Sequence, residues 1–412
     1  MTTHKDLSAI QANLTTIREL SDVPASFRIA ALMLLRAERG SLHFVLPDGR
    51  AVVFDHGLPG PAATVHIHSY DMTKKAMAGG DVGFAESFMD GDWTTPDLTA
   101  VLEFFSENFE AAGQLAVGGS VVKFLNKIRH FFNRNSKSGA RRNIMAHYDL
   151  GNDFYESWLD GTMTYSSALF DRPNLSLEQA QTAKYARIAD EIAAGPDSHI
   201  LEIGCGWGGF AEYAAKVRGS KVTCLTISQA QREYALERLH KQGLSDCVSI
   251  RLEDYRDHTG RYDGIASIEM FEAVGEAYWP SYFNKVRECL SDGAKAALQI
   301  ITIDNQLFKR YRKRADFIQR YVFPGGMLPS EVVLQSCFQA AGLRYNGVHY
   351  FGQDYAATLK AWAERFEQAW DHIQTLEFDD RFHRLWRFYL SYCEAGFRNG
   401  RINVGQFQVS RA

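Results

Sequence analysis

The sequence lacks the features that mark metal-binding, secreted or membrane-spanning proteins. Its six cysteines are scattered and form no Cys-X-X-Cys pair, and no His/Cys group has the spacing of metal ligands. No run approaches the roughly 18 consecutive apolar residues of a membrane span. The N-terminus has no basic segment followed by an apolar one, as a signal peptide would. We therefore expect a cytoplasmic protein with reduced thiols.

An excess of basic charge is also missing. The 412 residues carry a net charge of −4, with 23% charged and 46% hydrophobic residues. This is an ordinary globular balance that gives no reason to expect nucleic acid as a partner. The length suits two domains whose cores are stable without disulfides.

The N-terminal part, residues 1–110, has the pattern of a small α+β domain. Residues 41–57 alternate in polarity around Pro47-Asp48-Gly49, which predicts a hairpin. Residues 64–70 predict a third strand, and a helix is expected after the Thr-Pro-Asp sequence that ends at Asp97. No catalytic cluster is found here, and we interpret this part as a lipid-contacting domain only through the resemblance described below.

The next stretch contains no acidic residue between Glu110 and Asp149. Its apolar residues recur at helical spacing, and its basic residues are Lys123, Lys127, Arg129, Arg134, Lys137, Arg141 and Arg142. Residues 111–143 are thus predicted to form a basic amphipathic helix and a linker. Such a helix can rest on an anionic phospholipid surface or pack between two domains with its charges in water, and the pattern leaves both open.

Residues 144–412 have the pattern of an α/β domain. Strands are predicted at residues 198–203, 220–228, 248–255, 262–269 and 294–303, with helical segments between them. Strands that alternate with helices indicate a doubly wound, Rossmann-like parallel sheet.

The first of these strands runs into a glycine-rich loop, "LEIGCGWGGF". Glycines at such a place let the backbone approach a ligand closely and turn into a helix. The spacing is Glu-X-Gly-X-Gly-X-Gly-Gly, and no acidic residue ends the second strand at Thr226, which disfavours a standard NAD site. The third strand ends at Leu252, before Glu253 and Asp254, where a carboxylate can accept a hydrogen bond from an adenine amino group. We therefore expect S-adenosylmethionine as the cofactor.

A second polar stretch, "TMTYSSALF" at residues 162–170, contains adjacent hydroxyl groups. No histidine or lysine within it would activate Ser166 or Ser167 as a nucleophile. A catalytic serine is therefore not predicted, and the roles of the two serines depend on what surrounds them.

Six blocks in order give the chain a specific resemblance. They cover residues 147–408 and read "HYDLGNDFYESWLDGTMTYSS", "LEIGCGWGG", "LTISQAQ", "MFEAVG", "YVFPGGMLPS" and "AGFRNGRINVGQFQ". They resemble the cyclopropane fatty acid synthase family, which includes mycolic acid cyclopropane synthase-like lipid methyltransferases. That family uses S-adenosylmethionine to modify cis double bonds in acyl chains of membrane phospholipids.

The resemblance implies cofactor contacts at matching positions of this chain. Tyr165 and Ser166 would contact the methionine end, and Thr226, Ile227 and Gln231 would hold the ribose. The remaining positions, from the glycine loop and the adenine side, are Glu202, Gly204, Cys205, Gly206, Leu252 and Glu253.

The resemblance also implies a base site, because ring closure needs a proton to leave the delivered methyl group. Family enzymes are understood to use a bound bicarbonate held by a cysteine, a glutamate, a histidine, a backbone group beside an isoleucine, and a tyrosine. Here the glutamate is Glu272, the tyrosine Tyr321 and the isoleucine Ile301. Ser167 replaces the cysteine and Gln299 replaces the histidine.

Two further positions depart from the family pattern: Ala273 replaces a histidine and Glu269 replaces a glycine. Gln299 cannot become cationic, and Glu269, if it points inward, would repel bicarbonate or serve as a base itself. We therefore expect methyl transfer to a cis double bond that gives a methyl-branched unsaturated chain. The alternative is an ordinary cyclopropane, with Ser167 and Gln299 still holding bicarbonate. Phe170 and Phe323, with Tyr321, would stabilise the carbocation.

Two hypotheses from other classes remain. A non-catalytic lipid-binding paralogue would explain the altered base site, and a methyltransferase of small molecules or nucleic acids would share the cofactor loop. Through the resemblance we expect neither. We expect a peripheral enzyme at the inner face of the cytoplasmic membrane, with phospholipid as its partner and a homodimer as its assembly.

Overall fold

The computed structural model describes residues 9–108 and 150–412, which form parts of two compact units. Unit 1 contains Met1–Ile128 and Glu377–Asn399, and unit 2 contains Arg129–Leu376 and Gly400–Ala412. Each unit is described by itself below. The basic stretch predicted at 111–143 lies outside the described residues.

Unit 1 is built on a five-stranded sheet in the order β1-β3-β2-β4-β5. The strands are β1 (Ile10–Gln11), β2 (Arg39–Val45), β3 (Ala51–Asp55), β4 (Leu58–Ile67) and β5 (Trp93–Thr94). The predicted hairpin is present as antiparallel β2 and β3, with Leu42 opposite Phe54. The third strand begins earlier than expected, and it pairs with β2 in parallel.

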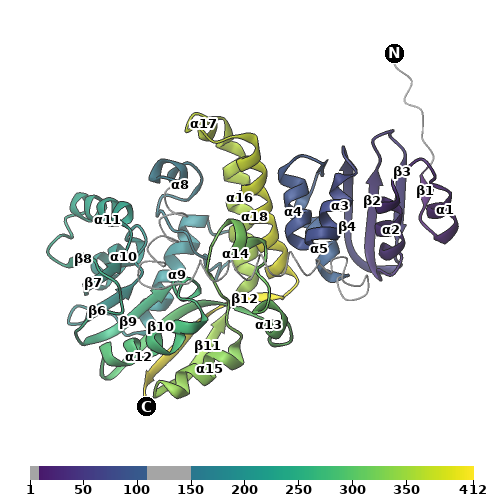
Figure 1. Cartoon of the computed structure of the whole chain (residues 1–412). Coiled ribbons are helices and arrows are strands. Elements are labelled where there is room, and N and C mark those ends of the chain that lie inside the picture. Colours follow the sequence, from purple (N-terminus) through teal and green to yellow (C-terminus); the bar gives the residue numbers. More distant parts are fainter. Residues whose placement is uncertain (1–8, 109–149) are drawn as a thin grey trace. The chain divides into compact units, whose positions relative to one another are not determined.

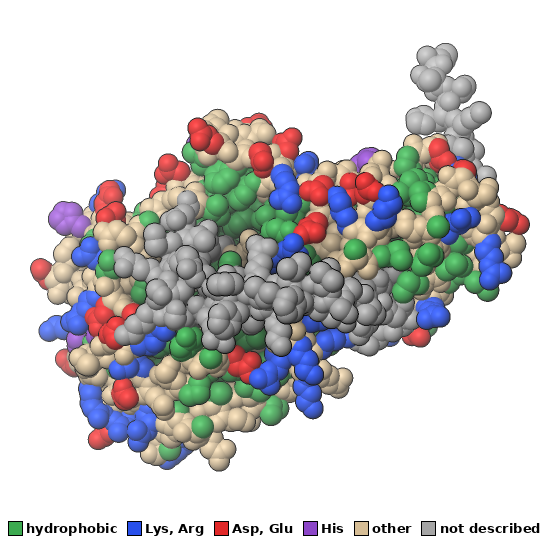
Figure 2. Space-filling model, viewed as in Figure 1, with side chains coloured by type: hydrophobic (Ala, Val, Ile, Leu, Met, Phe, Trp, Pro, Cys, Tyr) green, Lys and Arg blue, Asp and Glu red, His purple; other side chains and the backbone are tan. Residues whose placement is uncertain are grey.

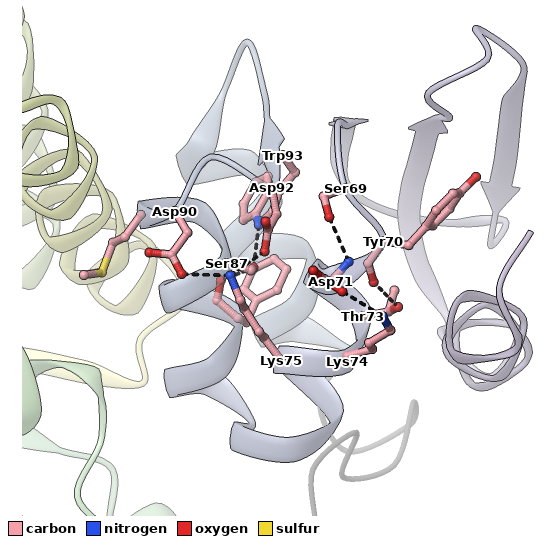
Figure 3. A network of polar contacts seen from close by, with 12 residues as sticks. Ser69, Tyr70, Asp71, Thr73, Lys74, Lys75, Ser87, Asp90, Asp92 and Trp93 are labelled. Atoms are coloured by element: carbon pink, nitrogen blue, oxygen red, sulfur yellow. Dashed lines mark hydrogen bonds and ion pairs between the residues drawn. The ribbon is translucent and has the colours of Figure 1, made fainter.

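The described helices of unit 1 are α1 (Leu14–Glu19), α2 (Ala25–Leu34), α3 (Asp71–Gly79), α4 (Asp81–Met89), α5 (Leu98–Glu107) and α18 (Asp380–Arg398). The first five lie beside the sheet (Figure 1), whereas α18 packs on α4 and α5. Figure 3 shows the polar contacts that join α3 to the end of α4: Lys75 Nζ lies 2.7 Å from Asp90 Oδ2 and 2.8 Å from Asp92 Oδ2. Beside them, Trp93 Nε1 donates to Ser87 Oγ at 2.9 Å. These contacts are structural, since they fix the corner between two helices and β5.

The helix α18 comes from the C-terminal part of the chain, yet it belongs to unit 1. Its Phe388 packs on Phe88 with ring centroids 5.9 Å apart, and Glu394 accepts a 3.0 Å hydrogen bond from Thr99. The sequence analysis placed all of residues 144–412 in one domain, and the structure differs from that boundary at Glu377–Asn399. An apolar helix face shows that a helix is buried, but not which sheet it packs against.

Unit 2 is built on a seven-stranded sheet in the order β11-β12-β10-β9-β6-β7-β8. The strands are β6 (His199–Ile203), β7 (Lys221–Thr226), β8 (Val248–Leu252), β9 (Tyr262–Ile268), β10 (Leu290–Ile303), β11 (Leu343–Tyr350) and β12 (Ile402–Arg411). The five strands predicted from the sequence are all present and pair in parallel. The strands β11 and β12 were not predicted, and β12 runs antiparallel between β10 and β11.

Apolar residues on this sheet alternate between two cores, as the two-residue period of strands requires. Leu201, Ile265 and Leu298 belong to one core, together with residues of α12 and α15. Ile200 and Ala297 belong to the other, together with residues of α9, α10 and α11. The sheet is therefore covered by helices on both faces, which confirms the doubly wound architecture (Figure 1).

The helices of unit 2 are α8 (Asn152–Trp158), α9 (Leu177–Glu191), α10 (Gly209–Arg218), α11 (Gln229–Lys241), α12 (Trp279–Cys289), α13 (Asn305–Tyr311), α14 (Phe317–Tyr321), α15 (Glu331–Ala340), α16 (Gly352–Gln368) and α17 (Trp370–Gln374), with short 3-10 turns at Phe271–Ala273 and Glu276–Tyr278. Within the described ranges, no helix is long and apolar enough to cross a bilayer. Acidic and basic side chains both occur over the face seen in Figure 2.

Candidate active site

The glycine-rich loop leaves the end of β6 in a conformation that favours glycine. Gly204, Gly206 and Gly208 have φ angles of 84°, 52° and 85°, in the region that side chains disfavour. The backbone N–H of Gly204 donates to Leu225 O at 2.9 Å, which ties the loop to β7. The helix α10 follows directly, so the loop joins a buried strand to a helix N-terminus.

Space around these glycines differs from one to the next. A Cβ added to Gly204 would lie 2.5 Å from Cγ of Met270, whereas one added to Gly206 would meet nothing within 4 Å. Gly204 therefore permits close packing, and Gly206 leaves the backbone open to a ligand.

Glu202 lies below the loop, almost fully buried, and Cys224 Sγ donates to its Oε2 at 3.5 Å. Burial raises the pKa of Glu202 to about 8.

The ends of β7 and β8 carry the residues predicted to contact the ribose and the adenine. Thr226 Oγ1 donates to Gln231 Oε1 at 3.2 Å, and both side chains are buried. The side chain of Leu252 is 41% exposed although it is a large apolar residue. An exposed leucine beside the carboxylate of Glu253 fits the edge and face of an adenine ring.

A histidine that the sequence analysis missed holds this carboxylate. His258 is buried, and its Nδ1 lies 3.1 Å from Glu253 Oε1 while its Nε2 lies 2.8 Å from Tyr262 Oη. The histidine comes five residues after the glutamate in an irregular segment, so no periodic pattern pointed to it. It fixes Glu253 at the carboxyl edge of the parallel strands, where ligands of doubly wound sheets bind.

These observations fit S-adenosylmethionine. The carboxyl ends of β6, β7 and β8 bring an open glycine loop, a buried Thr226–Gln231 pair and an exposed Leu252 to the same edge of the sheet. The part of the chain with described coordinates contains no group of three His, Cys, Asp or Glu residues that could hold a metal ion.

The stretch 162–170 is fixed from below by α9. Lys184 Nζ donates to Ser166 Oγ at 2.6 Å, and Gln181 Nε2 donates to Ser166 O at 2.9 Å. Lys184 is fully buried, and this burial lowers the pKa of its ammonium group. The sequence analysis missed Lys184, because a lysine in a helix is usually read as a surface residue.

Tyr165 belongs to an aromatic cluster. Its ring centroid lies 5.3 Å from that of Trp362, 5.4 Å from Tyr155 and 6.4 Å from Phe323, which is stacked. Aromatic faces form an apolar wall and can stabilise a nearby cation. Phe170 lies at the end of the same stretch, where its N–H donates to Asp354 Oδ2 at 2.9 Å.

The two replaced positions, Ser167 and Gln299, meet at the carboxylate of Glu269. Oε1 of Glu269 accepts 2.8 Å hydrogen bonds from Ser167 N and from Gln299 Nε2. Oε2 accepts a 2.6 Å hydrogen bond from the hydroxyl of Tyr355 on α16. The hydroxyl of Ser167 is turned away and donates to Ala168 O at 3.0 Å. Glu269 therefore points inward, which is the orientation in which we expected it to repel bicarbonate or serve as a base.

The backbone of Glu269 explains why a glycine suits this position. Its φ angle is 50°, a left-handed conformation that costs a residue with a side chain roughly 1–2 kcal/mol. The conformation follows directly after β9, and its N–H donates to Gln299 O at 2.9 Å, as a continuation of the pairing with β10. A glutamate here retains the geometry of a glycine turn and adds a carboxylate.

Glu272 lies one turn further along the chain. Its Oε1 accepts a 2.6 Å hydrogen bond from Ile301 N, which brings together two of the predicted base-site residues. Its Oε2 is buried and has no hydrogen-bond partner among the described residues. Burial, and next the charge of Glu269, raise the pKa of Glu272 to about 8.

Tyr321 is the last residue of α14. Its ring packs on Phe317 with centroids 5.6 Å apart. The chain after it returns to the site, since Met327 N donates to Glu272 O at 2.9 Å. The loop that carries Tyr321 is therefore joined to the turn of Glu272, while the predicted contact of Tyr321 with a base stays a prediction.

The glycine loop generates a first testable prediction. Gly204→Ala should weaken S-adenosylmethionine binding by at least about tenfold, because the added methyl clashes with Met270 and the backbone is left-handed. Isothermal titration calorimetry measures the loss. Gly243→Ala is the matched control: its φ is 69° and its added Cβ meets nothing within 4 Å, so it should lose stability alone. Equal affinity in both variants would contradict the proposed loop function.

Comparisons with known proteins agree with this geometry. The sequence model of the family described as mycolic acid cyclopropane synthetase matches residues 135–407. Tuberculostearic acid methyltransferase UfaA1 of Mycobacterium tuberculosis is 37% identical over 409 residues, which cover 94% of this chain and 92% of that protein. Cyclopropane-fatty-acyl-phospholipid synthase of Escherichia coli K12 is 35% identical over 356 residues, covering 85% and 88%.

Solved structures give the same family. The crystal structure of mycolic acid cyclopropane synthase CmaA1, complexed with SAH and CTAB, is 29% identical with a TM-score of 0.61, and the match covers 65% of this chain and 97% of that one. Cyclopropane synthase MmaA2 from Mycobacterium tuberculosis is 27% identical with a TM-score of 0.62, covering 66% and 98%. The chain therefore belongs to the mycolic acid cyclopropane synthetase family of S-adenosylmethionine-dependent lipid methyltransferases.

Proposed function

We propose that the protein transfers a methyl group from S-adenosylmethionine to a cis double bond of an unsaturated phospholipid acyl chain and releases a methyl-branched unsaturated chain. One relative is named a tuberculostearic acid methyltransferase and another a cyclopropane-fatty-acyl-phospholipid synthase. Whether the product is a branched olefin or a cyclopropane depends on which proton leaves the methylated acyl chain.

The residues at the carboxyl edge of the sheet bind the cofactor in this proposal. The loop at Gly206 would approach the methionine part, the Thr226–Gln231 pair the ribose, and Leu252 with Glu253 the adenine. When bound, S-adenosylmethionine supplies an electrophilic methyl group for the double bond. The protein contributes alignment and the exclusion of water, which a weak nucleophile such as an alkene requires.

Methylation leaves a carbocation on the acyl chain. The aromatic cluster around Tyr165 provides faces that stabilise such a charge without forming a bond to it. The reaction ends when a proton leaves the chain. Loss from the new methyl group, with attack on the cation, closes a ring. Loss from a carbon beside the cation, directly or after a hydride shift, gives a branched olefin.

One observation carries the choice of the olefin: an anion of the protein already lies between the two altered positions. The carboxylate of Glu269 is 2.8 Å from both Ser167 N and Gln299 Nε2. A bicarbonate at the same point would face a like charge at close range, which is strongly unfavourable where water is excluded. The arrangement therefore supports a reaction without the bicarbonate that ring closure uses in the family.

The product itself tests this proposal. Purified protein with S-adenosylmethionine and vesicles of a cis-monounsaturated phospholipid should yield acyl chains heavier by one methylene unit. Gas chromatography with mass spectrometry, before and after mild hydrogenation that spares cyclopropanes, should show that the product takes up hydrogen. A hydrogen-resistant cyclopropane as the sole product would contradict the proposal. Cofactor binding without any heavier chain would establish the non-catalytic alternative.

A second test asks which residues determine the product. The triple variant Ser167→Cys, Gln299→His and Glu269→Gly removes the internal carboxylate and introduces the residue types expected for the family. With added bicarbonate, a measurable share of its product should become cyclopropane, assayed as above.

The double variant Ser167→Cys and Gln299→His is the matched control, because it keeps Glu269 and should produce no ring. If the double variant forms cyclopropane as readily as the triple variant, Glu269 does not determine the product.

A further inference from the structure

We infer that the carboxylate of Glu269 is the group that removes the proton from the methylated acyl chain, so that the protein carries its own base as a side chain. This inference rests on the proposed function, in which an acyl carbocation must lose a proton. It assigns the base to one residue and excludes the need for a bound anion.

The first support is the way the carboxylate is held. Donors from three parts of unit 2 converge on it: Ser167 N before α9, Gln299 Nε2 on β10 and the hydroxyl of Tyr355 on α16. Gln299 is itself oriented, since its Oε1 accepts a 3.1 Å hydrogen bond from Gln406 Nε2 on β12. A general base must be held within hydrogen-bond reach of the proton that it removes, and this carboxylate is held at both oxygens.

The second support is the hydrogen-bonding capacity that remains. A carboxylate offers about four lone-pair sites. Oε1 of Glu269 accepts two hydrogen bonds, whereas Oε2 accepts one within the described part of the chain, from Tyr355. Oε2 is therefore the oxygen with room to accept a proton, and the phenol of Tyr355 stays in place as its partner.

The third support is the balance of charge around the group. The groups that act on Glu269 are Tyr355, the buried Lys184 of α9 and the neighbouring Glu272. Burial raises the pKa of Glu269, and the hydrogen bonds from Tyr355, Ser167 and Gln299 together with the charge of Lys184 lower it. Glu272 accepts one hydrogen bond, from Ile301 N, against three at Glu269. Two neighbouring carboxyl groups in different hydrogen-bonding environments are typical of an acid–base site.

The fourth support is the strained backbone. Glu269 holds a left-handed conformation with φ of 50° although it has a side chain. Strain of this kind persists where the surroundings impose it, and it concentrates at functional sites. A glycine would adopt the same turn without this cost. The strain therefore accompanies the carboxylate that Glu269 adds to the site.

The step balances without another reactant. The electron pair of a C–H bond adjacent to the cationic carbon forms the new C=C bond, and the proton passes to Oε2 of Glu269. Release of that proton to water restores the carboxylate. Together with methyl transfer, the sum is an alkene and S-adenosylmethionine giving a methyl-branched alkene, S-adenosylhomocysteine and one proton.

Glu269→Gln tests the inference, because glutamine keeps the shape and cannot accept the proton. The turnover of cis-monounsaturated phospholipid vesicles should fall by about 100-fold or more, as expected for the loss of a general base. S-adenosylhomocysteine affinity, measured by calorimetry, should stay within a few-fold, which shows that the variant is folded. Glu331→Gln is the matched control: Glu331 also accepts a tyrosine hydrogen bond, from Tyr350 at 2.9 Å, and it should keep its turnover. A Glu269→Gln enzyme with turnover close to the unmodified enzyme would overturn the inference.

Glu269→Gly provides a second variant should glutamine disturb folding. Glycine suits the φ of 50° and leaves space for a small anion between Ser167 and Gln299. Its turnover should be low, and added formate or bicarbonate should restore at least about a tenth of it, while the unmodified enzyme should show no dependence on either anion. Full activity of Glu269→Gly in buffer free of these anions would contradict the inference.

Tyr355→Phe generates a pH prediction. The Tyr355 hydrogen bond lowers the pKa of Glu269, so its removal raises that pKa. A base works when deprotonated, so activity is lost as the pH falls through the pKa, and this acidic limb should move to higher pH by about one unit. Tyr350→Phe is the control and should leave the limb in place. An unmoved limb in Tyr355→Phe would count against Glu269 as the titrating base.

These outcomes separate the inference from the proposed function. A cyclopropane product whose formation still depends on Glu269 would refute the branched-olefin proposal and keep the base. A branched olefin formed equally well by Glu269→Gln would keep the proposed function and refute the base.

Discussion

The carboxylate of Glu269 joins four segments that lie far apart along the chain. The carboxylate accepts hydrogen bonds from Ser167 N, Gln299 Nε2 and the hydroxyl of Tyr355. The backbone N–H of Glu269 continues the pairing of β9 with β10. A buried charge is stable only when it is paired or well hydrogen-bonded, so each of these segments is bound to the position of the others. The stretch 162–170, the two central strands and α16 are thereby held around one point, and that point lies where the parallel strands end.

The rest of unit 2 holds the residues around the carboxylate of Glu269 in position. Both faces of the sheet are buried in close-packed cores, and this packing fixes the positions of β9 and β10. Lys184 fixes Ser166 from below, and the resulting stretch sets the direction of Ser167 N. The charge of the buried amine also lowers the pKa values of Glu269 and Glu202. Position and charge are therefore supplied by the same few contacts.

The sequence predicted much of this architecture, but not the strand and the helix that complete the two units. The five parallel strands of unit 2 and the hairpin of unit 1 follow from alternation and turn residues, which are local signals. The strand β12 and the placement of α18 depend on contacts between residues that lie far apart in the sequence, and no local pattern encodes them. In the site, the substitutions at Ser167, Gln299 and Glu269 stood out against the family motifs. Lys184 and His258 did not, because their functions depend on burial and on partners that only the folded chain brings near.

The interruption of unit 2 between Leu376 and Gly400 has a consequence for how the protein is made. The helix α18 of unit 1 and the strand β12 of unit 2 both follow Leu376, after the rest of each unit has been synthesised. Since β12 lies inside its sheet, between β10 and β11, neither unit is complete until residues 377–411 have left the ribosome. An emerging chain must therefore keep two unfinished hydrophobic surfaces out of contact with other chains until that point.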